Sequence, residues 1–242
     1  ASTDTEVGGV IEGSGTFVKA GSGTLTLSGT NTYSGATTIN AGTLTVSGTL
    51  SDSTAVSIAS GATYDVDASD TVASIEGAGN IEIASSQTLT AGDGNDKTIS
   101  GDISGSGGLT KIGSGTQTLS GNNTYTGITT INTGTLKLTG SLSDSTAVSV
   151  ASGATFDVDS SDAVASIEGA GNIDIASSQE LTVGDSNDKT SSGVISGSGT
   201  LSKVGSGTLT LAGTNTKTGS IGIAGGTLSV SSSSNLGATQ AA

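Results

Sequence analysis

The feature that most constrains this chain is an internal repeat of 92 residues. The tetrapeptide Gly-Ser-Gly-Thr begins at residue 21, again at residue 113 and again at residue 205. The chain therefore reads as two full units, 9–100 and 101–192, followed by a partial third unit, 193–242. Because each repeat buries its apolar face by stacking on its neighbours, this array predicts a single elongated domain over residues 1–242.

Each unit consists of short runs in which apolar residues alternate with Thr, Ser, Asp or Glu. Thr24-Leu25-Thr26-Leu27 and Asn80-Ile81-Glu82-Ile83 are examples, and this alternation is typical of half-buried strands. In the first unit the candidate strands begin near residues 16, 24, 37, 43, 55, 62, 72, 80, 88 and 97. Turns rich in Gly, Ser and Asn separate these runs, and no stretch has helical spacing over a useful length.

These short strands predict an all-β fold, a right-handed parallel β-helix of about 13 coils. With two or three strands per coil, five coils of roughly 18 residues fill each unit, and a strand spacing of ~4.8 Å gives a rod roughly 60 Å long. Proline, which cannot donate a ladder hydrogen bond, is absent. A β-sandwich or jelly roll also uses alternating strands, but the regular coil length favours the solenoid. Val, Ile and Leu alternations throughout the chain disfavour a disordered linker.

Composition removes several classes of function. The chain has no Cys, His or Arg, so histidine-dependent nucleophilic catalysis and zinc sites are excluded. A net charge of −14 makes nucleic acid and anionic membranes poor partners. No run of about 18 apolar residues exists, so no helix of this segment is expected to insert into a membrane. The composition therefore favours a structural protein over an enzyme.

Acidic residues gather in the later part of each full unit and predict a solvated acidic band that recurs every five coils. Its members are Asp65, Asp67, Asp70, Glu76 and Glu82 in the first unit and Asp157, Asp159, Asp162, Glu168 and Asp174 in the second. Asp65 and Asp67 flank Val66, an arrangement that also matches the carboxylate pair of a polysaccharide hydrolase. Because the pair recurs in the second unit, a soluble strand face is the better interpretation, and no catalytic residue is assigned.

Two acidic turns are candidate cation sites. Gly92–Asp96 and Gly184–Asp188 faintly resemble a calcium-binding nonapeptide, which makes Asp93, Asp96, Asp185 and Asp188 candidate ligands for weakly bound Ca²⁺. A corner loop with Asp and Asn turn chemistry is the alternative. No other metal and no cofactor is predicted.

Lysine and asparagine recur in phase with the repeat. Lys19, Lys111 and Lys203 are expected five coils apart, roughly 24 Å by the ladder spacing, so they cannot form one patch. Each is expected to make a stacked corner interaction. A further set is expected at corners because it recurs in the same way: Asn31, Asn123 and Asn215, with Asn40 and Asn132.

The stretch from Gly15 to Leu44 resembles the autotransporter-associated β-strand repeat, also called the passenger-associated transport repeat. Further copies run from Gly107 to Leu136 and from Gly199 to Leu228. The glycines, the lysine, Asn-Thr-Tyr and Gly-Thr-Leu fall in register over about a third of each unit. Two positions depart from the pattern: Gln117 stands where the other copies have Leu, and Lys217 stands where Tyr is expected. If the Leu position points inward, Gln117 must find hydrogen bonds.

This resemblance implies the passenger region of a type V secreted protein at a Gram-negative cell surface, exported through an outer-membrane β-barrel that would be its partner. The expected function is a structural stalk or scaffold of an adhesin-like protein, which presents distal regions and aids export by folding outside the cell. Two alternatives stay open: the repeat face itself binds glycans, matrix or sister rods, or the chain is a β-helical polysaccharide-active enzyme. The tail Ser234–Gly237 looks like the usual continuation of the repeat, so a longer native chain is expected.

Overall fold

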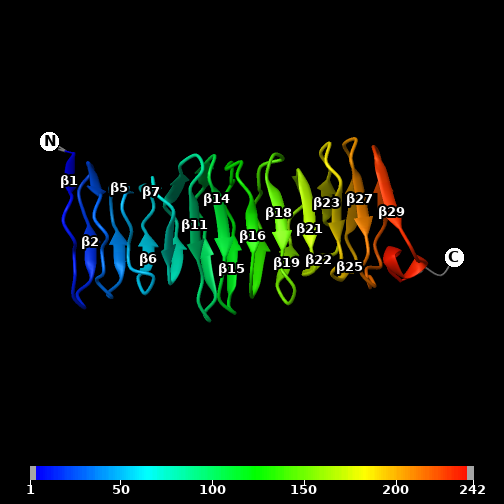
Figure 1. The fold of residues 1–242 in the computed structure, drawn as a ribbon, viewed down its shortest axis with the longest axis horizontal. Helices are drawn as coiled ribbons and strands as arrows, with labels where there is room; N and C mark the ends of the chain where they lie inside the picture. The colour runs from blue at the N-terminus through cyan, green and yellow to red at the C-terminus, as the bar shows by residue number, and fades with distance from the viewer. Residues whose placement is uncertain (1–3, 239–242) are drawn as a thin grey trace.

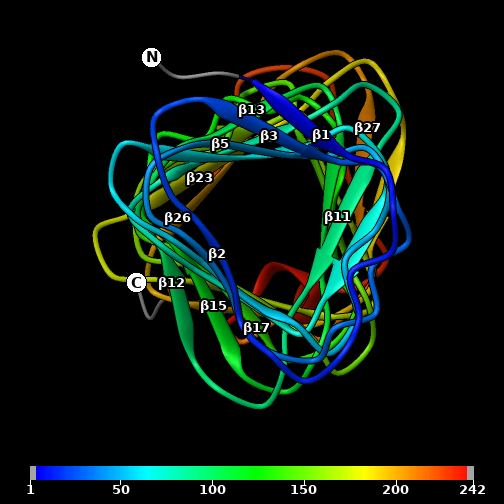
Figure 2. The same cartoon turned by 90° about the vertical axis from the view of Figure 1, so that its left-hand side faces the viewer.

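The computed structural model describes residues 4–238, which form one parallel β-solenoid with its chain ends at opposite ends of the rod (Figure 1). Viewed along the rod, the coils enclose a single interior surrounded by three faces (Figure 2). The chain passes from face 1 to face 2 to face 3 in every coil and then returns to face 1 one layer further on. No helix within residues 4–238 has the length and apolar character needed to cross a bilayer.

The strands of each face pair in parallel with those of the coils before and after. Face 1 contains β1 (Thr5–Val7), β3 (Thr24–Leu27), β5 (Gly42–Val46), β7 (Ala62–Val66), β10 (Asn80–Ile83) and β13 (Ile103–Gly105), and later β20 (Asp162–Val164), β23 (Glu180–Val183), β26 (Thr200–Lys203) and β28 (Ile221–Ile223). Face 2 contains β8 (Asp70–Val72), β11 (Thr88–Ala91), β14 (Gly108–Lys111), β16 (Thr129–Ile131), β18 (Ala147–Val150), β21 (Ser166–Gly169), β24 (Lys189–Ser191), β27 (Thr208–Leu211) and β29 (Thr227–Val230). Face 3 contains β2 (Phe17–Lys19), β4 (Thr37–Ile39), β6 (Ala55–Ile58), β9 (Ser74–Gly77), β12 (Lys97–Ile99), β15 (Thr116–Leu119), β17 (Thr135–Leu138), β19 (Thr155–Val158), β22 (Asn172–Ile175) and β25 (Ile195–Gly197). A 3₁₀ turn, η1 (Ser233–Leu236), follows β29.

Face 1 is continuous even where it has no regular strand between β13 and β20. The Tyr125 backbone N–H donates to the Ile103 carbonyl at 3.2 Å, and Asn122 forms a parallel bridge with Ser141. The Leu142 N–H then donates to the Asp162 carboxylate at 2.9 Å. Loop segments therefore carry the ladder across two coils.

The interior is a set of aliphatic stacks that run along the rod. On face 3, for example, Ile39 lies over Ile58, and Leu119 lies over Leu138 and then Val158. All five of these side chains are buried. Burying an aliphatic side chain of this size stabilises the fold by about 1.5–3 kcal/mol, so like residues stacked in successive layers build a core that needs few aromatic rings.

The solenoid has about 11 turns, whereas the sequence predicted about 13. Register partners in adjacent coils, such as Leu25↔Leu44 and Leu44↔Tyr64, are further apart along the chain than the predicted coil length. The estimate was too short because some segments of a coil give no strand signal. Asn31–Tyr33, on face 2 between β3 and β4, has no alternating pattern, and β9 follows β8 after Ala73 alone, with no turn residue to mark a separate strand.

The 92-residue unit does not contain a whole number of coils, so the predicted five coils per unit was wrong. From Leu25 the ladder climbs four coils through successive register partners on face 1 and reaches Ile103. Gln117, which is equivalent to Leu25 in the next unit, lies further along the chain, past β14 and in β15 on face 3. One unit is therefore four and two-thirds coils. Equivalent strands β3, β15 and β27 lie on faces 1, 3 and 2, respectively.

Deleting residues 101–192 should leave a folded, shorter rod. The deletion joins Ser100 to Gly193, which is equivalent to Gly101, so each strand after the junction meets the first-unit equivalent of its present partner. At ~4.8 Å per coil, we expect the rod to shorten by about 22 Å, measured as the maximum dimension in small-angle X-ray scattering. Deletion of 101–146 is the control: it joins the end of a face 3 strand to a face 2 strand and should not fold. A collapsed or unfolded product from the full-unit deletion would contradict the assigned repeat geometry.

Candidate functional site

A buried lysine at a corner of the solenoid is the most distinctive polar feature of the repeat. Lys19 ends β2 and is only 4% exposed. Its ammonium group donates to the carbonyls of Gly21 and Ala41, each at 2.8 Å, and to that of Ala20 at 3.4 Å. Ala20 and Gly21 belong to the same coil as the lysine, whereas Ala41 belongs to the next coil. The side chain therefore ties two consecutive coils together through their backbones.

This lysine clamp recurs in both later copies. Lys111 donates to the carbonyls of Ile112 at 2.6 Å, Gly113 at 2.8 Å and Thr133 at 3.3 Å. Lys203 donates to the carbonyls of Val204, Gly205 and Gly225. Burial lowers the pKa of Lys19 and of Lys111 below the usual range. The predicted corner interaction is therefore confirmed, but the three clamps lie on faces 3, 2 and 1 because of the fractional unit.

A glycine completes each clamp. Gly42, Gly134 and Gly226 have φ values of +67°, +69° and +65°, in the left-handed region that favours glycine. A Cβ atom on Gly42 would lie 2.8 Å from the Lys19 ammonium and 2.5 Å from the Gly23 carbonyl oxygen. The lysine and this glycine therefore form one unit of structure, which explains why both recur at the same spacing.

Buried asparagines add to the backbone hydrogen bonds where a face lacks a regular strand. Asn31 accepts a hydrogen bond from the Ile11 N–H at 3.1 Å and donates to the carbonyls of Gly29 and Thr49, each at 2.9 Å. These partners lie in the coil before, the same coil and the coil after. Asn123 repeats the pattern. The side chain thus adds hydrogen bonds to backbone groups of three successive layers.

The two departures from the repeat pattern have local explanations. Tyr33 and Tyr125 pair with the hydroxyls of Thr37 and Thr129 at 2.6 and 2.5 Å. In the third copy Lys217 is buried instead and donates to the carbonyls of Gly219 at 2.5 Å and Ser220 at 2.8 Å, and Ile221 stands in place of the threonine.

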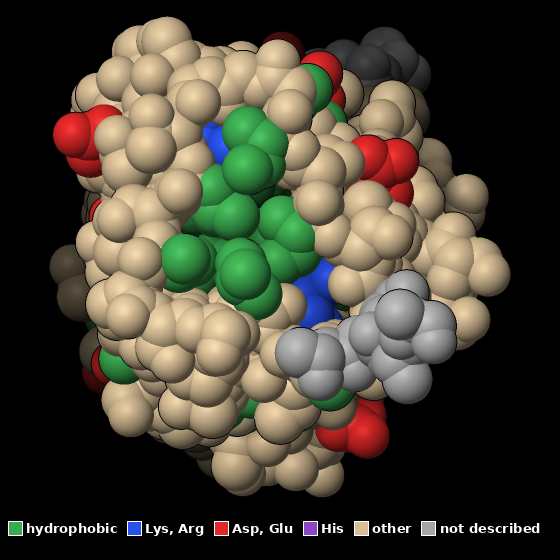
Figure 3. Space-filling model, turned by 90° about the vertical axis from the view of Figure 1, so that its right-hand side faces the viewer, with side chains coloured by type: hydrophobic (Ala, Val, Ile, Leu, Met, Phe, Trp, Pro, Cys, Tyr) green, Lys and Arg blue, Asp and Glu red, His purple; other side chains and the backbone are tan. Residues whose placement is uncertain are grey.

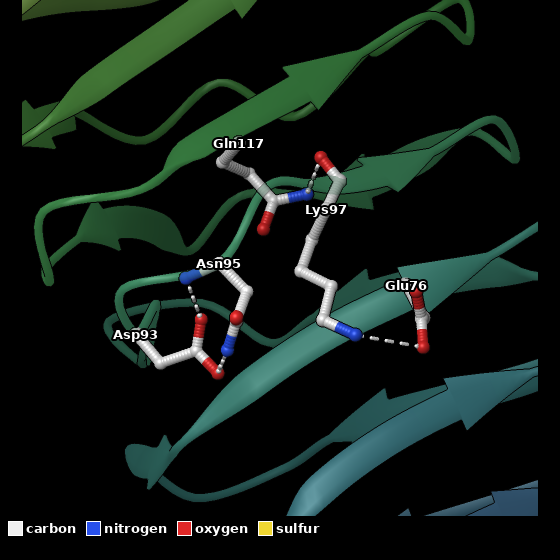
Figure 4. Close-up of polar contacts among 5 residues, drawn as sticks. All are labelled: Glu76, Asp93, Asn95, Lys97 and Gln117. Carbon is white, nitrogen blue, oxygen red and sulfur yellow. Dashed lines mark hydrogen bonds and ion pairs between the residues drawn. The ribbon is translucent and has the colours of Figure 1, made fainter.

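Gln117 is buried, and its amide donates to the Lys97 carbonyl at 3.3 Å (Figure 4). The equivalent region of the third copy, where Leu209 replaces the glutamine, has a small cavity of about 10 Å³. Ser166 lines it, and its hydroxyl is the one buried side-chain polar atom among the described residues that has no hydrogen-bond partner. A cavity of this size has room for about one water molecule.

The acidic residues do not form one band along the rod. Asp65 lies on face 1 and Asp157 on face 3, because each unit is rotated relative to the previous one. Asp65 is half-buried and accepts a hydrogen bond from the Thr45 hydroxyl at 2.9 Å. Burial and the nearby charges of Asp67 and Glu82 raise its pKa. In the second unit Lys137 occupies the Thr45 position and pairs with Asp157 at 3.0 Å and with Asp159.

Asp70 and Asp162 were expected in the solvated band, but they accept hydrogen bonds on the inner side of the coil. Asp70 is 4% exposed, and its carboxylate accepts from the Leu50 N–H at 3.1 Å and the Tyr64 hydroxyl at 3.0 Å. Burial raises the pKa of Asp70 to about 6. Asp162 is equivalent, half-buried and bonded to the Leu142 N–H, and burial raises its pKa to about 6 as well. The sequence signal was present: Asp70 occupies an inward position of the alternation, two residues before the apolar Val72.

The candidate calcium ligands accept hydrogen bonds within their own corners or from the next coil. The Asp93 carboxylate accepts from the Asn95 N–H at 2.7 Å and from its side-chain amide at 3.0 Å (Figure 4). Asp96 accepts from the Thr116 N–H at 2.8 Å, one coil further on. Their equivalents Asp185 and Asp188 do the same. In the described part of the chain no three acidic groups converge on one point. Calcium binding at these turns stays a prediction.

A family model described as the passenger-associated-transport-repeat matches residues 17–46, 109–138 and 201–230. These segments correspond to β2–β5, β14–β17 and β26–β29. Each contains the lysine clamp, its glycine and the buried asparagine. The resemblance predicted from the sequence is therefore confirmed in three copies. No curated protein and no solved structure matches the chain.

Replacing Lys111 by Met should destabilise the rod because the apolar stem is kept while three backbone carbonyls lose their donor. Leaving buried polar groups unsatisfied predicts a loss of about 2–4 kcal/mol in the free energy of unfolding, measured by urea unfolding. Lys137→Met is the matched control, since its ion pairs are partly exposed and should contribute less than about 1 kcal/mol. Equal losses in the two variants would show that the clamp has no special role.

Replacing Asp70 by Asn should flatten the pH dependence of stability. Its native pKa of about 6, against an ordinary 3.8, means that the native state holds this proton more tightly than the unfolded chain. The stabilisation of the native state by this bound proton is complete below about pH 4 and is lost as the pH rises to about 6. The change in the free energy of unfolding between pH 4 and 7 should therefore be smaller in Asp70→Asn, by on the order of 2 kcal/mol.

Urea unfolding at several pH values measures this change. Asp67→Asn, at an exposed position, is the control and should follow the unmodified chain. The facing groups are Tyr64, which donates to Asp70, and Asp52, whose charge raises its pKa. An unchanged pH profile for Asp70→Asn would refute the assignment.

Proposed function

Since three segments of this chain are passenger-associated transport repeats, we propose that the protein is the scaffold of an autotransporter passenger, exported through an outer-membrane β-barrel to the surface of a Gram-negative cell. In this role it is a stalk that presents more distal regions of an adhesin-like protein. Repeats of this family combined with a parallel β-solenoid fit such a scaffold.

The observation that carries the proposal is the lysine clamp within each matched segment. Within each matched segment the clamp links two consecutive coils, through the carbonyls of Ala41, Thr133 and Gly225. A clamp between adjacent layers stabilises the rod locally, and it does so whether or not the rest of the chain has folded. A scaffold needs this local stability, and a catalytic pocket does not require it.

The same architecture supports a contribution to export. A chain that emerges from a pore can add one coil after another, because each coil needs only its immediate neighbour for its hydrogen bonds. Each clamped coil then opposes movement of the chain back through the pore. The absence of cysteine avoids premature disulfides during passage through the periplasm.

A structural role is also the better match to the side chains present. The described residues place their recurring buried polar groups, Lys19, Asn31 and their equivalents, against backbone carbonyls and N–H groups. The partly exposed carboxylates Asp157 and Asp159 pair with Lys137. We therefore propose that the segment has no enzymatic activity of its own.

Display on a Gram-negative host tests the export role. The full chain is placed between a cleavable signal peptide and an autotransporter β-barrel, and surface exposure is measured by accessibility to added protease. We expect efficient display of the unmodified chain and a several-fold reduction for Lys111→Met, with Lys137→Met unaffected. Equal display of all three, with Lys111→Met shown to be destabilised in solution, would contradict a role for coil stability in export.

A further inference from the structure

The backbone ladder is interrupted at one junction in each full unit. At the junction of β9 and β12 only Ile99 and Gly77 are register partners, and at the equivalent junction of β21 and β24 only Gly169 and Ser191 are. The next junctions on the same faces, β12 with β15 and β24 with β27, each have three pairs. We call the two interrupted junctions the first seam and the second seam. Because the ladder contributes less at a seam, side chains contribute more to holding its two coils together.

An ion pair bridges the outer side of each seam. Lys97 pairs with Glu76 across the first seam (Figure 4), and Lys189 pairs with Glu168 across the second, each at 3.0 Å. The two pairs are formed by equivalent residues of consecutive units. Since all four side chains are partly exposed, the outer surface is closed in the same way at both seams.

The inner sides of the two seams differ by one residue. In the first seam the residue stacked on Lys97 is Gln117, which is buried and whose amide donates to the Lys97 carbonyl at 3.3 Å. In the second seam the residue stacked on Lys189 is Leu209. Leucine has no polar side-chain atom, so the second seam lacks the amide that bridges the first one.

The cavity of about 10 Å³ described above lies at the second seam, with Ser166 of β21, Lys189 of β24 and Leu209 of β27 in its wall. Its lining residues lie between 165 and 209, in coils that have a paired neighbour on both sides. The interior of the rod is rich in hydrophobic side chains, as its C-terminal end shows (Figure 3), yet the buried Ser166 hydroxyl here has no hydrogen-bond partner. A buried hydroxyl without a partner is unfavourable. A cavity that contains such a group binds water, whereas a purely apolar cavity stays dry.

The charges around the cavity favour a neutral occupant. Lys189 and Lys203 both line it, which disfavours a cation, and Asp185 lines it as well, which disfavours an anion. Its volume accommodates about one water molecule. Asn187 and Thr208 also line the cavity, so a molecule bound to the Ser166 hydroxyl has further polar groups nearby. Size, charge and hydrogen bonding therefore agree on water.

We propose that this cavity is a binding site for a single water molecule, which hydrogen bonds to the Ser166 hydroxyl and bridges the inner side of the second seam. In the first seam the carboxamide of Gln117 bridges the coils without water. The proposal explains why the repeat accepts either residue at this position: a glutamine alone, or a leucine with one bound water, completes the same junction. The site is independent of the export role proposed above.

Exchanging the residues of the two seams tests the site. Magnetic relaxation dispersion of water oxygen nuclei counts the long-lived internal waters of the full chain. We expect Leu209→Gln to lower this count by one, because its carboxamide takes the place of the water. Gln117→Leu should raise the count by one, because a second cavity then forms beside the buried Ser74, which is equivalent to Ser166. Ser166→Ala should lose one water, and Ser74→Ala is the matched control that should lose none.

A crystal structure of the full chain locates the same molecule. Density for one water at about 2.5–3.0 Å from the Ser166 Oγ atom supports the proposal. Three results would overturn it: no density at this position, an unchanged water count in Ser166→Ala, or an equal loss in Ser166→Ala and Ser74→Ala. Circular dichroism checks that each variant is folded. Ser166→Ala removes a single oxygen atom, so it keeps the test decisive even if Leu209→Gln does not fold.

Discussion

Everything in this structure depends on hydrogen bonds between the backbones of adjacent coils. In a parallel solenoid each layer must offer its N–H and C=O groups to the layers on both sides, because an unpaired buried group costs about 1–3 kcal/mol. Where strands are regular the ladder meets this demand. Where strands are irregular, side chains add to the backbone bonds: Asn31 bonds to backbone groups in three successive layers, and Lys19 bonds to carbonyls in two. The absence of proline follows from the same demand.

The fractional length of the repeat changes how the surface is organised. Since one unit is four and two-thirds coils, equivalent side chains move to a different face with every copy, as Asp65 and Asp157 do. The acidic groups therefore wind around the rod and do not gather on one side. The acidic residues that account for the net charge of −14 therefore lie on more than one face. The lysine clamp is unaffected by this rotation because the carbonyls that it binds lie in its own coil and in the next one.

The alternation of apolar and polar residues was enough to locate most strands, and the resemblance of Gly15–Leu44 to a known repeat was enough to identify the lysine and glycine positions. The sequence did not predict the role of side chains that lie outside the alternating runs or at their ends. Asn31 lies in a segment that resembles a loop, yet this segment forms face 2 of its coil. Asp70 was grouped with surface acids, but its place in the alternation turns it inward toward Tyr64. Periodicity identifies which side of a strand a residue occupies only once the strand boundaries are known.

By itself, the sequence determined the repeat, the all-β solenoid and the family resemblance, because these depend on spacing and alternation along the chain. Tertiary structure alone decided the coil length, the rotation of each unit and the partners of the buried lysines. These depend on which residues meet across adjacent layers, and that register is set by the turns together with the loop segments that complete a face without a regular strand. A small change in coil length leaves every local pattern unchanged and yet moves each later copy to another side of the rod.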